Sequence, residues 1–349
     1  MTAIWNYSEA DFIYETRWNE SSFSALSKFD EALLECWRQK ENENLFRYKL
    51  NVKKHRFLSG NYRLFLQLNP ERAVLRRAPE SFESFHKPFN ADSFNFTKIQ
   101  EAEKMFELRK SSETDPSDET KNILAINVSP IQYGHTLILP SLYKCLPQVM
   151  TKESLRVSLD IILLSASPSC RIVYNSPCAY ASVNHLHFHL LYLDEKMLLE
   201  TIEVEHLSGP CYELTNYPGK GFMFELSKGT SNEALVSDVF KLISLLQKRN
   251  VAHNLCMTRG CWQKKSVSNM ENERNCIRIY VWCRSPNYGS KAVWDINPAA
   301  AELFGLFSLK NSDLFESISE EEAAKILIDI TDNVFWSIRN DVKLLFLTT

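Results

Sequence analysis

A chain of 349 residues with 44% hydrophobic and 24% charged residues has an ordinary globular composition and is long enough for two modest domains. Its formal net charge of −3 and the lack of a basic stripe argue against nucleic-acid binding, and no apolar run approaches the length of a membrane span. The N-terminus lacks the basic head and apolar core of a signal peptide, so a cytoplasmic location and nine reduced, mostly buried cysteines are expected.

The first 200 residues alternate between helical and strand-like patterns. The predicted elements are an amphipathic helix over 22–38, a strand over 62–68, a loop or short strand over 94–97, a helix over 101–109, strands over 123–128 and 135–139, a helix over 153–165 and a strand over 171–174. The polar, acidic stretch 110–120 has no apolar anchor and is predicted to be a mobile loop. Antiparallel strands interrupted by helices indicate an α+β fold.

The run 182–193 places three of the chain's eight histidines, His185, His187 and His189, at alternating positions. Alternation is the period of a β-strand, so the three imidazoles are expected on one face of a strand. The apolar residues between them are then expected in the core. Three histidines on one face point to a functional site.

Three explanations fit this pattern. The histidines could be satisfied by structural hydrogen bonds, although grouping three of them would be costly. Two of them could share a zinc ion with a further ligand from elsewhere. Alternatively, one imidazole could attack a phosphorus atom, since its pKa leaves an unprotonated nitrogen at neutral pH. The small, polar segment 175–182 favours the third explanation, because such a segment can present hydroxyl, amide and backbone N–H groups to phosphate oxygens.

Basic and sulfur-containing side chains elsewhere give weaker signals. Arg76 and Arg77 are predicted to be solvated surface residues, with contact to a phosphate group as the less favoured reading. The spacings of the cysteine pairs 256/261 and 276/283 fit no strong zinc pattern. No metal and no cofactor are therefore expected, and the sequence does not decide the oligomeric state.

The second half repeats the strand-and-helix composition without a histidine triad. A boundary is expected around 194–221, which divides the chain into a catalytic half, 1–200, and a second half, 201–349. The elements expected after the boundary are a strand over 222–226, a helix over 231–249 opened by a capping box from Thr230 to Glu233, strands over 251–257 and 276–282 that pair with each other, and a C-terminal helix opened by a capping box from Ser319 to Glu322.

Two segments together resemble the histidine triad superfamily. They are GHTLILP at 134–140 and the run SVNHLHFH at 182–189. The superfamily contains nucleotide hydrolases and nucleotidyl transferases such as galactose-1-phosphate uridylyltransferase. The resemblance implies a histidine-triad fold with two related halves, one carrying catalysis and the other completing the pocket.

Further matches cover about residues 22–300 and are similar to the GDP-hexose phosphorylases, in particular the animal branch that acts on GDP-D-glucose. The matching segments are LFRY (45–48), QLN (67–69), FNFTK (94–98), NVSP (127–130), NHLHF (184–188) and AVW (292–294). The implied substrates are the small molecules GDP-hexose and inorganic phosphate, which react to give GDP and hexose 1-phosphate.

The resemblance also implies roles for individual residues. His187 would attack the phosphorus next to guanosine and carry the guanylyl group. His185 and His189 would orient that ring or donate to phosphate oxygens as protonated imidazoles. Ser182 and Asn175 fall at phosphate-binding positions. His135, on the neighbouring strand, would position the triad, or it is simply a satisfied structural histidine.

The third triad position leaves an alternative function open. Uridylyltransferases and the plant phosphorylases carry glutamine there, whereas His189 is typical of the nucleotide hydrolases of the superfamily. The alternative is therefore a nucleotide or nucleotide-sugar hydrolase that uses water in place of phosphate.

Overall fold

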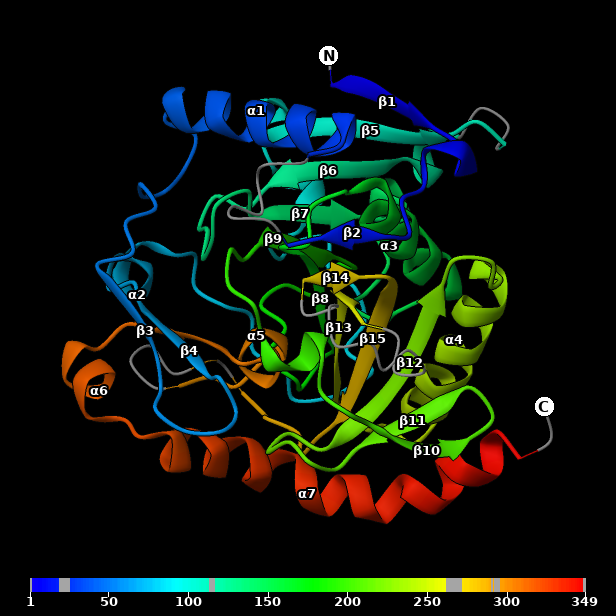
Figure 1. Ribbon diagram of the computed structural model, residues 1–349. Helices are drawn as coiled ribbons and strands as arrows, with labels where there is room; N and C mark the ends of the chain where they lie inside the picture. Colours follow the sequence, from blue (N-terminus) through cyan, green and yellow to red (C-terminus); the bar gives the residue numbers. More distant parts are fainter. Residues whose placement is uncertain are drawn as a thin grey trace.

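The computed structural model describes residues 2–18, 26–112, 117–261, 272–289, 291 and 296–347. Its centre is a sheet of 11 strands that runs from the top to the bottom of Figure 1. The strand order is β1 (Ala3–Tyr7), β5 (Lys104–Lys110), β6 (Asn122–Ile126), β7 (Thr136–Leu139), β9 (Phe188–Tyr192), β8 (Cys170–Asn175), β13 (His253–Gly260), β15 (Cys276–Cys283), β12 (Gly221–Ser227), β11 (Cys211–Leu214) and β10 (Glu205–Ser208). β1 and β5 are parallel, and the other neighbours are antiparallel.

The sheet passes without interruption from the first half of the chain to the second. Strands from residues 3–192 form one side, strands from 205–283 form the other, and β8 pairs with β13 where they meet. Val173 on β8 lies opposite Cys256 on β13. The division of the chain into units 1–200 and 201–349 stays a prediction.

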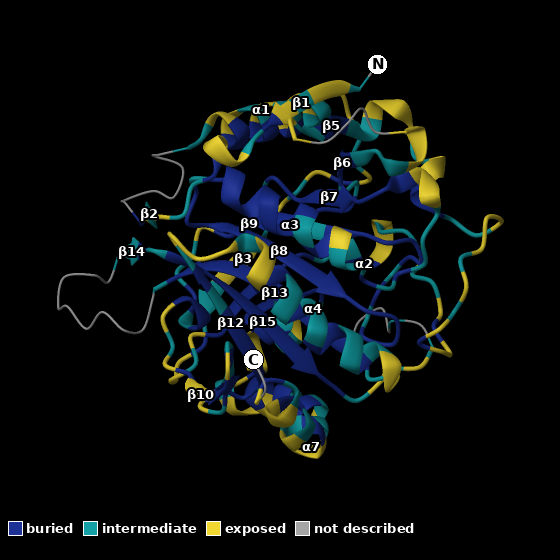
Figure 2. Cartoon of the chain, turned by 90° about the vertical axis from the view of Figure 1, so that its right-hand side faces the viewer, coloured by how far each residue is buried: buried dark blue, intermediate teal, exposed yellow. Residues whose placement is uncertain are grey.

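One face of the sheet packs against helices α1 (Lys28–Asn42), α3 (Lys152–Leu164) and α4 (Asn232–Lys248), and the long helix α7 (Glu320–Leu345) runs along the bottom of Figure 1. Figure 2 shows α3 and α4 in front of the buried strands. Leu186, Phe188 and Leu190 enter this core, as the alternation of the triad run predicted. Burial of these apolar side chains is the main stabilising contribution to the fold.

The opposite face is covered only in part, which leaves room for a site. A second core lies under a three-stranded sheet and two short helices. These elements are β3 (Lys54–Phe57), β4 (Phe65–Leu68), β16 (Leu306–Leu309), α5 (Ala300–Phe304) and α6 (Ser312–Ser317). A third, smaller core surrounds Phe96, beside β6 and β7. His189 projects from β9 to this face, because it lies between Phe188 and Leu190, which face the helices.

The predicted helix over 101–109 is wrong. Only Glu101–Glu103 form a single 3₁₀ turn, and Lys104–Lys110 form β5 between β1 and β6. The segment is rich in helix-forming residues, but pairing on both sides buries Met105 and Phe106 in the sheet. Tertiary packing therefore overrides local propensity here.

The boundaries of other elements differ less from the predicted ones. Helix α1 begins at Lys28, with Ser27 as its N-cap, and residues 22–25 of the predicted helix lie outside the described part. The expected boundary region 194–221 contains β10 and β11. Of the expected mobile loop 110–120, residue 110 ends β5, residues 118–120 form a 3₁₀ turn, and 113–116 are outside the description.

One of the two predicted capping boxes is confirmed and the other is wrong. Ser319 caps α7 with Glu322 as its partner, as predicted. Helix α4 is capped by Ser231, whose hydroxyl accepts from the Ala234 N–H at 3.2 Å. Thr230 instead donates its hydroxyl to the Ser227 carbonyl, so the predicted capping box from Thr230 to Glu233 is wrong and the N-cap lies one residue later.

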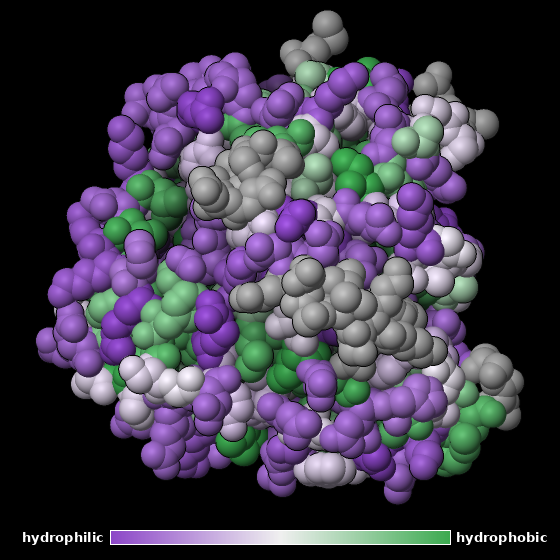
Figure 3. Space-filling model, in the orientation of Figure 1, coloured by the Kyte–Doolittle hydropathy of each residue, from purple (hydrophilic) through white to green (hydrophobic). Residues whose placement is uncertain are grey.

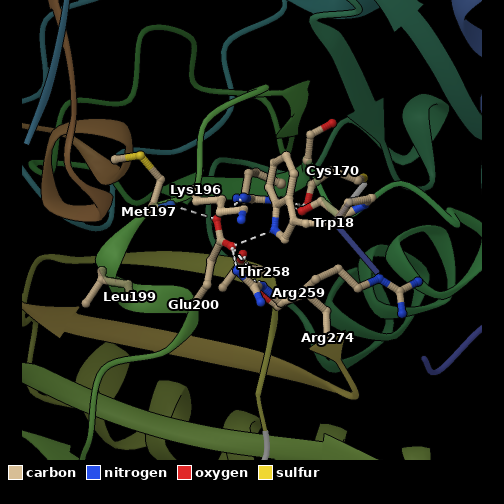
Figure 4. A network of polar contacts seen from close by, with 12 residues as sticks. Trp18, Cys170, Lys196, Met197, Leu199, Glu200, Thr258, Arg259 and Arg274 are labelled. Atoms are coloured by element: carbon tan, nitrogen blue, oxygen red, sulfur yellow. Dashed lines mark hydrogen bonds and ion pairs between the residues drawn. The ribbon is translucent and has the colours of Figure 1, made fainter. Parts of the chain in front are cut away.

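A buried cluster of charges joins distant segments and is shown in Figure 4. Glu200, in the 3₁₀ turn Leu198–Glu200, is fully buried and forms ion pairs with Arg171 and Arg274. Its Oε2 also accepts from Trp18 Nε1 at 3.0 Å, and its Oε1 accepts from the Met197 N–H at 3.0 Å. This carboxylate thus connects the N-terminal segment, β8 and β14 (Glu273–Arg274).

All nine cysteines are free thiols and six of them are buried, which agrees with the predicted reduced state. Among the residues described, no helix combines the length and the apolar character that crossing a bilayer requires. Figure 3 shows hydrophilic side chains over most of the face that it presents, with hydrophobic ones in scattered groups.

Candidate active site

The three histidines of the triad do not share one strand face. Strand β9 begins at Phe188, so only His189 lies in regular strand, and His185 and His187 precede it in an irregular segment. The rings of His187 and His189 are neighbours, with centroids 5.0 Å apart. The ring of His185 lies instead between Phe89 and Phe96. The predicted common face therefore holds for two histidines and is wrong for the third.

His185 uses both of its ring nitrogens for the backbone. The Phe96 N–H donates to Nδ1 at 3.1 Å, so Nδ1 is the unprotonated nitrogen. Nε2 therefore carries the proton and donates to the Leu142 carbonyl at 3.0 Å. Burial lowers the pKa of His185 to about 4. With no nitrogen left over, this imidazole fixes local structure and cannot contact a substrate through its ring nitrogens.

His187 has the opposite arrangement, with one nitrogen held and one free. Its Nδ1 lies 2.7 Å from the carbonyl oxygen of His185 and must donate to it, which leaves Nε2 unprotonated. Its backbone N–H donates to Oε1 of the fully buried Gln148 at 2.9 Å. Burial lowers the pKa of His187 to about 4, so Nε2 is a free base at neutral pH. This is the state that a nucleophile requires.

His189 is oriented by His135 on β7's side of the sheet. The Ile131 N–H donates to Nδ1 of His135 at 3.1 Å, so Nε2 of His135 carries the proton. That nitrogen lies 3.1 Å from Nδ1 of His189 and donates to it. Nε2 of His189 therefore carries a proton and is available as a donor. Asn127 Oδ1 accepts from the Ser129 N–H at 3.0 Å, so its Nδ2, which lies 3.2 Å from Nε2 of His135, is a second donor at that nitrogen and not its acceptor.

The four imidazoles are neutral. Burial is the main cause that lowers the pKa of each, and for His135 and His189 the neighbouring imidazoles and Arg72 lower it further. The prediction that protonated imidazoles supply the positive charge is therefore wrong. Neutral rings can be packed side by side because they do not repel one another, and the positive charge comes from other side chains.

This neutrality predicts a loss of stability in mild acid. His185, His187 and His253 each have a folded-state pKa of about 4, below the unfolded value near 6.5. Between these values the unfolded chain binds more protons, so stability falls as the pH falls from 6.5 towards 4. Each group should cost about 2 kcal/mol at pH 5. Urea unfolding at pH 7, 6 and 5 measures the loss, and an unchanged midpoint would contradict the buried neutral state.

Two cavities of about 680 Å³ each meet at the histidines. Both are lined by Arg72, Arg76, Ser182 and His189. The first cavity also contains His187, and its remaining walls mix apolar side chains with Arg77, Glu103, Asn127 and Ser129. Its apolar lining includes Phe96, Ile99, Val128, Leu137 and Val183.

The second cavity is polar and is built by both halves of the chain. Asn175 and His135 come from the first half. The second half contributes Lys291, Glu302 and Lys310. The second cavity therefore has four basic side chains, counting the two shared arginines, and one carboxylate.

Arg76 is the notable cation at the junction of the cavities. Its Nη2 is buried and finds no hydrogen-bond partner among the described residues. Burial and the neighbouring Arg72 lower the pKa of Arg76. Arg72 itself donates to the Ser129 carbonyl. A buried guanidinium without a partner is costly unless an anion occupies the junction.

The sequence reading of this arginine was wrong, since Arg76 was predicted to be solvated surface. The one available signal was its position shortly after the matched segment 67–69. Arg77, its neighbour, lines the first cavity and lies over the ring of Phe94. Gln148, Glu302 and Lys310 were not singled out at all, because nothing in their local sequence differs from ordinary surface or core residues.

The predicted substrate-binding residues are brought together in part. Ser182 lines both cavities. Asn175 lines the second, but its Oδ1 already accepts from Asn254 Nδ2 at 2.7 Å and from the Ala300 N–H at 2.9 Å. Asn175 therefore joins the two halves of the molecule at the cavity wall.

Comparisons with known proteins agree with this arrangement. Residues 28–191 match the family described as "GDPGP1-like, N-terminal domain", and residues 194–343 match "GDPGP1-like, C-terminal domain". GDP-D-glucose phosphorylase 1 of Xenopus laevis is 34% identical over 93% of this chain and 90% of its own. The Danio rerio protein of the same name is 36% identical over 93% of each chain. GDP-L-galactose phosphorylase 2 of Arabidopsis thaliana is 28% identical over 89% of this chain and 74% of its own.

A solved structure supports the fold. Yeast Ap4A phosphorylase, solved in complex with Ap4A, has a TM-score of 0.58 at 14% identity and covers 87% of this chain and 97% of its own. The predicted α+β, histidine-triad-like fold is confirmed. Family matches over both halves and relatives more than 30% identical along nearly the whole chain lead to one conclusion: this chain belongs to the GDPGP1-like family.

Proposed function

We propose that this protein is a GDP-hexose phosphorylase that converts GDP-D-glucose and inorganic phosphate to GDP and glucose 1-phosphate. The names of its relatives support the substrate, since six of them are GDP-D-glucose phosphorylases. The observation that carries the proposal is the unprotonated Nε2 of His187, which has no hydrogen-bond partner among the described residues and lies beside the junction of two cavities that share Arg72 and Arg76.

In the first step, Nε2 of His187 attacks the α-phosphorus of GDP-glucose. The new N–P bond replaces the bond from that phosphorus to the oxygen that bridges to the β-phosphorus, and glucose 1-phosphate leaves. In the second step, an oxygen of inorganic phosphate attacks the same phosphorus, the N–P bond breaks and GDP is released. A covalent intermediate divides one difficult displacement into two easier ones.

The groups at the junction stabilise the charge that develops on the phosphoryl oxygens. Arg76 supplies a buried Nη2 that has no hydrogen-bond partner among the described residues, and His189 supplies its Nε2 proton. Preorganised donors of this kind are usually the largest contribution to catalysis. The leaving group is itself a phosphate, which departs as an anion at neutral pH. A neutral triad is therefore sufficient, since no strong general acid is needed.

Removal of the Arg76 guanidinium tests its role at the junction. We expect Arg76→Met to lower kcat/KM by on the order of 10²–10³, the cost of losing one oxyanion-stabilising donor. Arg249→Met is a matched control, because Arg249 is an exposed arginine that pairs with Asp341 away from the cavities. Equal rates for the two variants would remove Arg76 from the proposal.

The second cavity supports phosphate over water as the acceptor. Four basic side chains line it, an arrangement that suits a phosphate dianion and that a water nucleophile does not need. The nine free thiols are typical of a reducing compartment, so the cytoplasm stays the proposed location.

The direct test is to incubate the purified protein with GDP-glucose, with and without inorganic phosphate, and to identify the products. We expect GDP and glucose 1-phosphate, and only when phosphate is present. Release of GMP without phosphate would instead identify a hydrolase. A histidine at the third triad position, such as His189, is typical of the nucleotide hydrolases of the superfamily. No product in either case would refute both activities on this substrate.

A further inference from the structure

The second cavity contains a carboxylate that the displacement chemistry does not use. Glu302 lies on α5, in the second half of the chain, and lines this cavity together with Lys291 and Lys310. One of its oxygens, Oε2, accepts from the Ala299 N–H at 2.9 Å, which fixes the side chain at the start of the helix. The side chain is thus held in place while it faces the cavity.

Charge explains why a carboxylate can lie there. Burial raises the pKa of Glu302 overall, and Lys291 and Lys310 only partly oppose this shift, so both lysines lie close to the carboxyl group. Burial, Arg76 and Arg72 lower the pKa of Lys291 to about 7, so the positive charge of the second cavity at neutral pH comes mainly from its other three basic side chains. A site for inorganic phosphate alone would have no use for an anion, because a carboxylate repels phosphate.

A sugar phosphate accounts for both kinds of group. Its phosphate needs cations, and its hydroxyls need hydrogen-bond acceptors, which the oxygens of a carboxyl group provide. The first cavity contains His187 and has both apolar side chains, such as Phe96 and Val183, and polar ones, such as Asn127 and Glu103, a mixture that suits a nucleoside. The part of the substrate on the other side of the attacked phosphorus must then extend into the second cavity.

We propose that the second cavity is the hexose 1-phosphate subsite, in which Lys310 and Arg76 bind the phosphate and Glu302 accepts hydrogen bonds from hexose hydroxyls. This inference rests on the proposed function. Inorganic phosphate occupies the phosphate end of the same subsite in the second step, because it attacks from where glucose 1-phosphate left. Glu302 therefore contributes to the half-reaction that involves hexose 1-phosphate, whereas Lys310 contributes to both half-reactions.

The two half-reactions allow this assignment to be measured separately. GDP and the enzyme exchange label with inorganic phosphate through the guanylylated histidine, a reaction that contains no sugar. GDP-glucose exchanges label with glucose 1-phosphate through the same intermediate. We expect Glu302→Gln to slow the glucose 1-phosphate exchange at least tenfold more than the phosphate exchange. Lys310→Met should slow both exchanges to a similar degree.

A matched control separates binding from helix capping. Glu322 has the same capping position on α7, where its Oε2 accepts from the Ser319 N–H at 2.9 Å, but it does not line either cavity. Glu322→Gln should leave the ratio of the two exchanges at the wild-type value. Glutamine keeps an oxygen that can accept from Ala299, so Glu302→Gln is expected to fold.

The outcomes are distinct. A Glu302→Gln enzyme with the wild-type ratio of exchanges would overturn the subsite assignment, even though the wild-type enzyme works. A wild-type enzyme that catalyses neither exchange would overturn the proposed function itself. A selective loss of the hexose exchange in Glu302→Gln, with Glu322→Gln normal, would establish Glu302 as a specificity-determining residue.

Discussion

His187→Asn is expected to lose phosphorolysis by about 10⁴-fold or more, the scale of loss when a covalent nucleophile is removed. Asparagine can still donate towards the His185 carbonyl, which accepts from Nδ1 of His187 at 2.7 Å, but its amide has no nucleophilic nitrogen. The readout is twofold: turnover of GDP-glucose, and trapping of the guanylyl group on the protein from labelled GDP. Both should vanish.

His185→Asn provides the comparison within the triad. The ring of His185 lines neither cavity and contacts the backbone at Phe96 and Leu142. We expect this variant to be destabilised but still to form the guanylylated protein at low temperature, because the carbonyl that orients His187 remains. A guanylylated His187→Asn protein, or a trap abolished equally by both changes with the fold intact, would contradict the assignment of the nucleophile.

Glu200→Gln is expected to destabilise the protein by about 3–5 kcal/mol, the usual cost of breaking a buried ion pair. Arg171 and Arg274 both pair with this carboxylate, and all three side chains are almost completely buried. Glutamine is nearly the same size but neutral, so two buried guanidinium groups would lose their counter-charge. A fall of this size is large against the 5–15 kcal/mol that holds a typical domain folded.

Urea unfolding at pH 7 measures this loss, and Glu316→Gln is the matched control. Glu316 pairs with Lys54 on the surface, where both side chains are more than half exposed. The control should leave the urea midpoint unchanged, since solvent screens such pairs. Equal midpoints for the two variants would mean that the buried cluster contributes little to stability.

The sequence predicted the parts of the site whose evidence is local. Alternation placed Leu186, Phe188 and Leu190 in the core, and the triad pattern singled out His187. The sequence could not predict which nitrogen of each ring is free. That depends on the backbone of Phe96 and Leu142, which lie 89 and 43 residues from His185 in the chain.

The same limit applies to the charges of the site. Protonated imidazoles were expected because three histidines near phosphate suggest positive charge, but burial favours the neutral form of each. The cations Arg76 and Lys310 come from opposite halves of the chain, and the parallel pairing of β4 with β16, which sets Leu68 opposite Leu309, brings the segments that carry them to one cavity. No single stretch of the sequence contains residues from both halves, so no local pattern predicts that they meet at one cavity.

The uninterrupted sheet restricts how a ligand can enter and leave. Five residue pairs, from Arg171–Thr258 to Asn175–Asn254, hold β8 to β13, and the Asn175 side chain adds hydrogen bonds across the same junction. Separating the two halves of the molecule to admit a substrate would break all of the backbone pairing between β8 and β13. The junction between β8 and β13 is therefore expected to stay intact throughout the catalytic cycle.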